Sequence, residues 1–457
     1  MARKCESFSN QGAYTSHGHS IAAKGISAFS QIYKCDAYEA DAYSIYTNRA
    51  TAGAMRAYGI PQITFAMESH VEDIAKKLGI DSIKLRQKNM MEVGFKDDFS
   101  KNENYFDSLN QCIAKGREYI HWDEKLEKYK NQTGPVRRGI GMSIFWYNTA
   151  VWPISLETSA CRMVLNQDGS IQLQVAETEI GQGADTVFAQ MASEALGIKF
   201  EDVHVISTQD TDVTPFGTGA YASRQTYVAG FSIKQTADLL KDKILGHAQE
   251  LTRMPQANLD IKDGNIVRIS DGRALMTLGD LANEVLYSLT NCEHITAEST
   301  YQIKSNAYSF GCCFAEVEVD IPLCRVNVLD IINVHDCGKL INPQLAEAQV
   351  HGGMSMAIGY ALSEQLLYDE KTGKPLNNNL LDYKLCTTMD HPHLEAQFVE
   401  NYEPTSAFGT KALGEPPAVP AAPAIRNAVL NATGVSMYKL PLNPHNLFVR
   451  FKEEGLI

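Results

Sequence analysis

Long apolar runs, an excess of positive charge and closely spaced cysteine pairs are all missing from this chain of 457 residues. No stretch approaches the roughly 18 uninterrupted apolar residues that a membrane-spanning helix needs. The 54 acidic residues outnumber the 41 basic ones, and the resulting net charge of −13 argues against a nucleic-acid-binding surface. We therefore expect neither a membrane nor a nucleic acid as a partner.

The ten cysteines are scattered along the chain, and no Cys-x-x-Cys pair occurs. A zinc ribbon or a cysteine-ligated iron–sulfur cluster therefore has no local support, and we predict no metal-ligating side chains. Arg3 and Lys4 are followed by no apolar segment, so the start of the chain does not have the pattern of a secretory signal. These features predict a cytoplasmic protein whose electrons, if it performs redox chemistry, leave through groups on other chains.

A composition of 44% hydrophobic and 21% charged residues is typical of a globular protein with a large core. Apolar residues spaced three and four apart predict a helix that starts near Pro61 and stops at Gly79. Asp81 is expected to cap a second, short helix that ends near Asn89. A cluster of helix-breaking residues at 131–135 then predicts a boundary, which divides the chain into residues 1–135 and 136–457.

Strand patterns dominate after this boundary, so the predicted fold class is mixed α/β. Residues 166–169 join two strands as a hairpin, and Gly181-Gln182-Gly183 lies between a strand and a helix that leads to a further strand. Residues 253–300 are predicted to be a polar connector, and residues 8–58 show no clear opening element. The other predicted elements are a helix at 231–247 and strands at 314–319 and 326–334.

Two glycine-rich segments are candidates for holding a ligand. Gly181-Gln182-Gly183 opens a helix, where backbone N–H groups can meet an anion, although an ordinary tight turn is the more frequent explanation. It is not a dinucleotide fingerprint, because Thr186 stands where the third glycine would be. The polar loop 208–224 ends in Arg224 and can wrap a phosphate-bearing ligand; a solvated loop with Arg224 on the surface is an equally frequent alternative.

Asn342 and Pro343 begin a helix with many small residues, so another segment must approach its backbone closely. Ser355 within this helix is one residue short of the Gly-x-Ser-x-Gly motif of serine hydrolases, and a helix is the wrong place for such a nucleophile. The His-x-His pairs at 17–19 and 391–393 are expected to be exposed loop residues rather than metal ligands.

Glu415 gives the sharpest single signal. A residue that precedes proline is disfavoured in helical conformations, so Glu415 is expected on a stiff, extended backbone, with Gly414 permitting a ligand to come close. Apolar neighbours on both sides would raise its pKa and suit it to be a general base. Taken alone, the motif is more often a surface turn.

Five motifs follow one another along the chain at 54–62, 179–183, 221–224, 349–353 and 414–417. In this order they resemble the molybdenum-binding subunits of the xanthine dehydrogenase and xanthine oxidase family, of the bacterial type with separate molybdenum, flavin and iron–sulfur chains. The resemblance runs from about Asn10 to the end. It implies a molybdopterin-binding α/β fold in two related lobes, the remainder of the first in residues 1–135 and the second in 136–457.

The resemblance also implies roles for individual residues. Glu415 matches the general base, and Tyr58 takes the place of an aromatic residue that stacks on a purine. The pterin dithiolene would hold the molybdenum, so no side chain needs to ligate it. The residues expected to bind the cofactor are Arg56, Gly181, Gln182, Ala222, Ser223 and Gln349.

The implied activity is that of a purine hydroxylase of the xanthine dehydrogenase type, which converts hypoxanthine or xanthine to urate. Glu415 would take the proton of a hydroxyl group on molybdenum, whose oxygen attacks the ring carbon while hydride passes to a sulfido ligand. Electrons would leave through an iron–sulfur subunit and an FAD subunit; the residues leave the final acceptor open, NAD included. The residues leave the nucleotide form of the pterin open, a cytidine dinucleotide included.

Two alternatives follow from the same residues. One is a hydroxylase of nicotinate, another N-heterocycle or an aldehyde. The family's subunit normally begins upstream, with a small α/β domain and a glycine-rich loop that this chain does not contain. A separate chain would then supply that part, or the protein is an inactive truncated fragment that serves as a scaffold.

Overall fold

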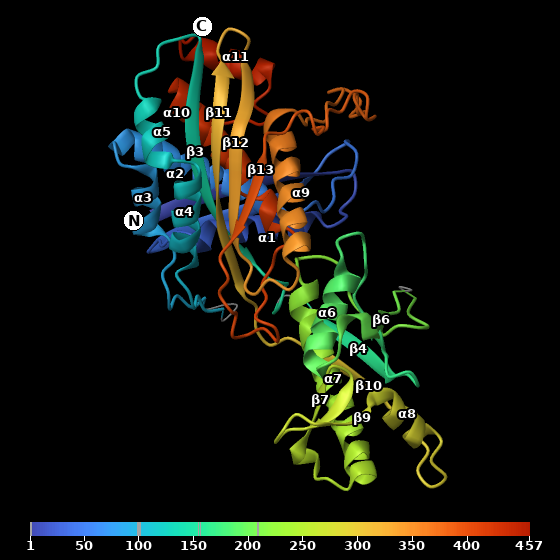
Figure 1. The fold of residues 1–457 in the computed structure, drawn as a ribbon. Coiled ribbons are helices and arrows are strands. Elements are labelled where there is room, and N and C mark those ends of the chain that lie inside the picture. Colours follow the sequence, from blue (N-terminus) through green and yellow to red (C-terminus); the bar gives the residue numbers. More distant parts are fainter. Residues whose placement is uncertain (1, 98–101, 154, 156, 208–209) are drawn as a thin grey trace.

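The computed structural model describes residues 2–97, 102–153, 155, 157–207 and 210–457, which form a larger and a smaller part (Figure 1). The larger part is built on a four-stranded sheet in the order β13-β12-β11-β3. Within it, β11 runs antiparallel to both β3 and β12, and β13 joins β12 in parallel. The strands are β3 (Val136–Asn148), β11 (Tyr308–Asp320), β12 (Arg325–Asp336) and β13 (Leu394–Phe398).

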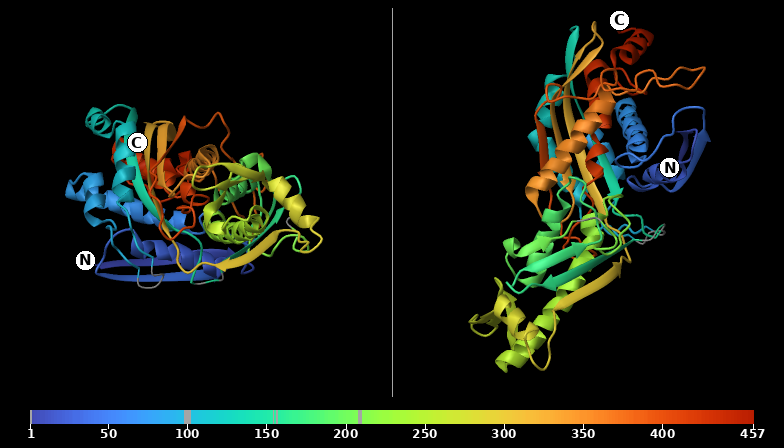
Figure 2. Two further views of the ribbon diagram at one scale, coloured as in Figure 1. Left: turned by 60° about the horizontal axis from the view of Figure 1, so that its bottom comes forward. Right: turned by 90° about the vertical axis from the view of Figure 1, so that its right-hand side faces the viewer.

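Both faces of this sheet are buried. Along β11, Cys312 and Phe314 belong to one apolar core, while Cys313 and Ala315 belong to the other. The strand therefore reads as a nearly continuous apolar run instead of an alternation. Helices cover the two faces (Figures 1 and 2): α4 (Ser108–Tyr119) and α5 (Trp122–Lys128) on one, and α9 (Pro343–Leu362), α10 (Ala421–Thr433) and α11 (Pro444–Glu453) on the other.

Both predicted helices near residues 61–89 are confirmed. They are α2 (Ile60–Leu78), which ends at the left-handed Gly79, and α3 (Ser82–Asn89), whose first turn is capped by the Asp81 side chain accepting from the Lys84 amide at 2.9 Å. These two signals are local, since a cap and an apolar periodicity need no distant partner.

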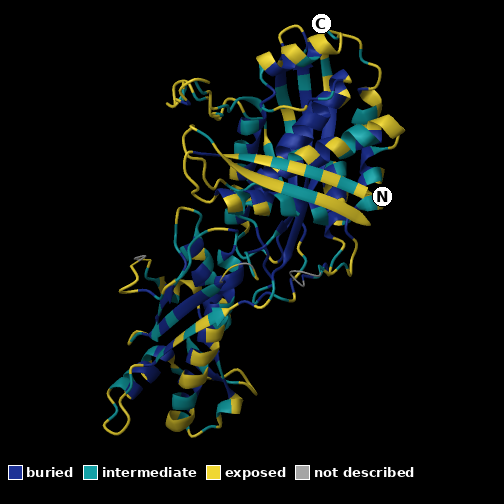
Figure 3. Ribbon diagram, turned by 180° about the vertical axis from the view of Figure 1, so that it is seen from behind, coloured by how far each residue is buried: buried dark blue, intermediate teal, exposed yellow. Residues whose placement is uncertain are grey.

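A two-stranded parallel sheet forms the outermost layer of the larger part. It consists of β1 (Ala2–Gly12) and β2 (Ala37–Tyr46), and it packs on α1 (Gly18–Gln31). Figure 3 shows these strands exposed along much of their length. Phe8 and Tyr43 stack on each other at 5.1 Å between ring centres and are 65% and 47% exposed. Residues 8–58 therefore do contain regular elements, which sequence patterning missed because apolar side chains lie on the outer face.

The smaller part is built on the sheet β10-β4-β5-β6. The predicted hairpin is confirmed as β4 (Thr158–Leu165) and β5 (Ile171–Val175). The strand, glycine turn, helix and strand unit is confirmed as well, because α6 (Ala184–Leu196) connects β5 to the parallel strand β6 (Val203–Val205). The long helix α7 (Gln225–Thr252) and β10 (Thr296–Gln302) also belong to this part.

The predicted polar connector at 253–300 was wrong. This segment forms a small sheet and a helix in addition to β10, and its strands are only four residues long, too short to show a periodicity. The elements are β7 (Leu259–Lys262), β8 (Asn265–Arg268), β9 (Ala274–Thr277) and α8 (Leu278–Leu286). Among the described residues, no helix is both long and apolar enough to cross a membrane.

Candidate active site

A cavity of about 1420 Å³ lies where the larger and smaller parts meet. Its wall combines residues of α1, the loop before α2, the end of β3, the starts of α6 and α7, and the first turns of α9. Sequence analysis placed eight residues in one site, and all eight line this cavity. They are Arg56, Tyr58, Gly181, Gln182, Ala222, Ser223, Gln349 and Glu415.

Arg56 connects three segments of the wall. Its Nε donates to the backbone oxygen of Gly414 at 2.7 Å, and its Nη2 donates to the backbone and side-chain oxygens of Gln349 at 2.9 and 3.2 Å. A guanidinium presents five donors in a planar fork, so it can reach both neighbours at once. The loop before α2, helix α9 and the Glu415 turn are thereby held together.

Glu415 is held at both its backbone and its side chain. Its amide donates to Ser223 Oγ at 2.8 Å, and Tyr147 Oη donates to its Oε2. Burial raises the pKa of Glu415, as expected from its apolar neighbours, while the hydrogen bond from Tyr147 and the nearby charge of Lys24 oppose that rise. The arrangement suits a carboxylate that accepts a proton.

The expected extended backbone at Glu415 was wrong. Its φ and ψ are −101° and −38°, within the helical region, and it caps the short 3₁₀ turn η3 (Pro416–Ala418). The amide of Ala418 donates to the Glu415 carbonyl at 3.1 Å and closes this turn. The contacts to Ser223 and Tyr147 add to this bond, and together they outweigh the steric preference that a following proline imposes.

Gly181 and Gly183 do not offer free amides to an anion. The amides of Gly181 and Gly183 donate to Glu179 Oε1 at 2.6 and 3.2 Å, and the Asp185 amide donates to Glu179 Oε2 at 3.1 Å. These bonds lower the pKa of Glu179 against the effect of burial. The start of α6 therefore carries its own carboxylate in the place where an external anion was predicted.

The sequence left two alternatives open for Arg224, a place on the surface or contact with a phosphate-bearing ligand. The structure shows neither. Arg224 is fully buried, with Nε at Glu157 and Nη1 donating to Glu177 at 2.6 Å. The two preceding residues, Ala222 and Ser223, have φ of 50° and 51°, in the left-handed region. The buried ion pairs of Arg224 thus anchor a strained turn at the cavity wall. Residues 208–209 of the predicted loop lie outside the described residues.

One of the small residues of helix α9, Gly353, allows the turn η3 to pack closely on the helix. A Cβ on Gly353 would stand 2.4 Å from Pro417 Cβ and 2.7 Å from the Pro417 carbonyl carbon, so η3 packs directly on the helix backbone. Ser355 lies inside α9 and hydrogen-bonds to His391 at 2.9 Å. A nucleophile elbow needs a sharp turn between strand and helix, so this pair gives the hydrolase alternative no support.

Sequence analysis missed Tyr147 and Lys24, which both line the cavity. Lys24 Nζ lies 5.0 Å from the centre of the Tyr147 ring and donates to the Asn148 carbonyl at 3.3 Å. Tyr147 stands in the middle of an apolar strand, where an aromatic residue looks like core, and Lys24 lies on a helix that patterning did not find. No local signal identifies either.

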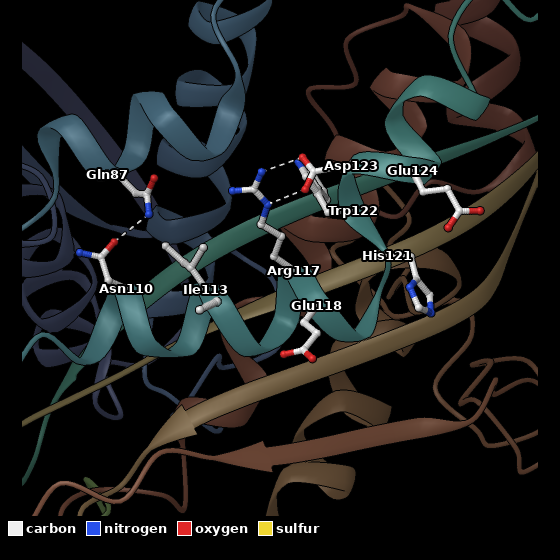
Figure 4. Close-up of a pocket in the computed structure, with 10 residues that line it drawn as sticks. Gln87, Asn110, Ile113, Arg117, Glu118, His121, Trp122, Asp123 and Glu124 are labelled. Atoms are coloured by element: carbon white, nitrogen blue, oxygen red, sulfur yellow. Dashed lines mark hydrogen bonds and ion pairs between the residues drawn. The ribbon is translucent and has the colours of Figure 1, made fainter.

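A second, smaller cavity of about 420 Å³ lies on the α4–α5 surface (Figure 4). There Arg117 pairs with Asp123 at 2.7 Å, and Gln87 bonds to Asn110 at 2.8 Å. These side chains satisfy one another, and none of the eight predicted residues lies there. The cavity between the two parts is therefore the candidate active site.

Comparison with protein families gives a match to the molybdopterin cofactor-binding domain over residues 115–392, and a second model of that description matches residues 1–90. The chain belongs to the molybdopterin cofactor-binding family. Within this family, it is 47% identical over 98% of its length to the xanthine dehydrogenase molybdenum-binding subunit of Escherichia coli O157:H7. That alignment covers 60% of the E. coli subunit, so the chain spans about three fifths of that relative.

A more distant family member is the gamma subunit of the 6-hydroxypseudooxynicotine dehydrogenase complex of Paenarthrobacter nicotinovorans. It is 26% identical over 98% of the chain, which covers 58% of that subunit. Among solved structures, quinoline 2-oxidoreductase from Pseudomonas putida 86 matches with a TM-score of 0.88 and 24% identity, over 98% of this chain and 59% of the other. The solved structure shares the fold of this chain, and the family matches confirm the molybdopterin-binding domains predicted from the motifs.

A molybdopterin-binding chain needs a roomy, polar site. The wall includes Thr218 and Trp146, whose Oγ1 and Nε1 atoms are buried with no hydrogen-bond partner among the described residues. Gly181, also in the wall, has no atom within 4 Å of the place where a Cβ would stand, which leaves open space on that side of its Cα. The volume, the unpaired donors and this opening fit a large polar cofactor.

Proposed function

We propose that this chain is the cofactor-binding, catalytic part of a molybdenum hydroxylase that acts on a purine, in the manner of a xanthine dehydrogenase. The observation that carries the proposal is the convergence of eight residues from five distant motifs on one cavity. The identity of 47% with a xanthine dehydrogenase molybdenum-binding subunit supports the purine as substrate class. The predicted division near residue 135 into two cofactor-binding lobes is part of this proposal.

Arg56, Gly181, Gln182, Ala222, Ser223 and Gln349 would hold the molybdopterin. When bound, this cofactor supplies oxygen transfer and takes up two electrons, which is chemistry that side chains lack. Arg56 fixes the relative positions of Gln349 and the Glu415 turn. Ala222 and Ser223 line the cavity in a strained turn, and the buried ion pairs of Arg224 hold that turn in shape.

Glu415 would act as the general base and Tyr58 as the ring that stacks on the substrate. Burial makes the Glu415 carboxylate a better proton acceptor, because its pKa rises toward the working pH. Tyr58 has a left-handed backbone with φ of 54°, and its ring meets the edge of His17 at 6.1 Å between centres. Tyr58 lines the cavity, so its ring could stack there on an electron-poor ring.

The electrons would pass to an iron–sulfur subunit and an FAD subunit. Among the described residues no cluster of three or more metal-ligating side chains occurs. About two fifths of that relative lies outside the alignment, and we propose that polypeptide equivalent to that remainder packs on the exposed β1–β2 sheet. None of the ten cysteines, all of them among the described residues, forms a disulfide, which suits the proposed cytoplasmic location.

The test is metal analysis of the natively purified complex, together with xanthine-dependent dye reduction by the wild type and Glu415→Gln. Loss of a general base lowers the rate by roughly 10²–10⁴, while the molybdenum content should stay unchanged. Glu316→Gln is the matched control, because Glu316 also accepts a bond from a buried tyrosine, Tyr129, but lies outside the cavity. A complex without molybdenum, or an active Glu415→Gln variant, would contradict the proposal.

A further inference from the structure

Two hydrogen bonds hold Glu415, one at its backbone and one at its carboxylate. Its backbone amide donates to Ser223 Oγ at 2.8 Å, and Tyr147 Oη donates to Glu415 Oε2. These bonds join the turn before η3 to the turn before α7 and to the end of β3. The carboxylate can only accept, and the Tyr147 hydroxyl is its donor.

The side chain of Tyr147 is held rigidly. Its side chain is fully buried, and β3 pairs with β11 along its whole length, with Tyr147 opposite Ser309. Lys24 Nζ lies over the ring face at 5.0 Å. A phenol fixed in this way cannot follow a carboxylate that turns, so its bond favours one orientation of Glu415.

We propose that Tyr147 is a positioning residue for the general base: it fixes the orientation of the Glu415 carboxylate and supplies the hydrogen bond that the charged form needs. The proposal rests on the proposed function of Glu415. The proton that the base removes from the reacting group ends on Glu415. Tyr147 keeps its own proton throughout and serves only as a donor.

The charges around Glu415 explain why this bond matters. The titratable groups that face it are Lys24 of α1, Arg56 and Tyr58 of the loop before α2, and Tyr147 of β3. Burial lowers the pKa of Lys24 to about 8, so its stabilising charge fades as the pH rises past that value. Burial raises the pKa of Tyr147 well above its usual value, so its hydroxyl stays a donor over the whole working range.

The first experiment uses the cofactor-free chain and infrared difference spectra recorded against pH. The protonated-carboxyl band that Glu415→Gln removes identifies Glu415. In Tyr147→Phe this band should persist to a higher pH than in the wild type, because the charged carboxylate has lost a donor. Tyr129→Phe removes the same kind of bond, to Glu316, and should leave the Glu415 band unchanged. A Glu415 band that titrates at the same pH in Tyr147→Phe and the wild type overturns the proposal.

The second experiment uses the loaded complex. A hydrogen bond to a charged group stabilises that charged form, so its loss in Tyr147→Phe should leave less of Glu415 ionised at mildly acidic pH. We expect kcat to fall there by about 10- to 100-fold, with KM little changed. The acid limb of the kcat profile should move to higher pH, so that raising the pH restores much of the rate. A uniform loss of kcat at all pH values would overturn the proposal, since misfolding or lost cofactor acts independently of pH.

The two experiments separate this inference from the proposed function. If Glu415→Gln remains active, Glu415 is not the base and the proposed function fails, whatever the infrared band does. If Glu415→Gln is inactive while Tyr147→Phe leaves both the band and the acid limb in place, Glu415 is still supported as the general base, but Tyr147 does not position it.

Discussion

The close packing of η3 on α9 predicts that Gly353→Ala damages both stability and the site. The added Cβ would stand 2.4 Å from Pro417 Cβ and 2.9 Å from the Ala418 amide nitrogen, about 1 Å nearer than ordinary van der Waals contact. Backbone atoms cannot rotate away as the end of a long side chain can. Either η3 or α9 has to move.

The magnitude follows from two opposing effects. Overpacking of this kind destabilises by about 1–3 kcal/mol, and the clash with backbone atoms puts it at the upper end. Replacing glycine by alanine inside a helix returns up to about 1 kcal/mol. We therefore expect a net destabilisation of about 2 kcal/mol. A displaced η3 would also strain the bond from Tyr360 Oη to the Ala418 carbonyl at 2.8 Å, and with it the position of Glu415.

Urea unfolding and dye reduction measure the two consequences. Gly246→Ala on α7 is the matched control, because a Cβ there meets no atom within 4 Å and should stabilise by up to about 1 kcal/mol. The two alanine variants should thus differ by about 3 kcal/mol, and only Gly353→Ala should lose activity. If Gly353→Ala were as stable as Gly246→Ala, η3 would not lie against α9 as described, and the reasoning would fail.

Two further predictions concern buried charge. His335 on β12 is fully buried, neither of its ring nitrogens has a hydrogen-bond partner among the described residues, and burial lowers its pKa to about 3. Below about pH 6.5 the unfolded chain holds a proton on this histidine that the folded chain does not, so the free energy of unfolding should fall by about 2 kcal/mol from pH 7 to pH 5. Urea unfolding of His335→Phe should lack that part of the loss. An identical pH dependence in both proteins would refute this. Arg56→Lys should lower the molybdenum content and activity about tenfold, because an ammonium cannot reach both the Gly414 carbonyl and Gln349, and a variant with normal metal content would contradict that role.

The parts of the fold that could be predicted are those with local signals. Asp81 and Asn342 cap helices as expected, and the hairpin at 166–169 needs only its turn residues. The strands β7, β8 and β9 were missed because four residues do not reveal an alternation. The exposed aromatic residues of β1 and β2 hid those strands, since patterning assumes that apolar side chains face inward.

The residues of the candidate site also separate into those that local motifs identify and those that only the structure shows. Its eight residues could be found because each belongs to a short motif, and the motifs occur in a recognisable order. Tyr147 could not, because its partner Glu415 is 268 residues away and nothing near it in the sequence marks the contact. The occupation of the Gly181 turn by Glu179 could have been anticipated, since an acidic residue just before a helix competes with any outside anion for its amides.

The order of the strands in the larger sheet has a consequence for biosynthesis. β3 ends at Asn148 and its partner β11 begins at Tyr308, so 308 − 148 = 160 residue positions separate the two neighbours. At roughly 5–20 residues per second, a ribosome needs about 8–32 seconds to deliver the second strand after the first. During that interval the apolar β3 has no neighbour on that edge, and an unpaired apolar strand is a site where a nascent chain can aggregate.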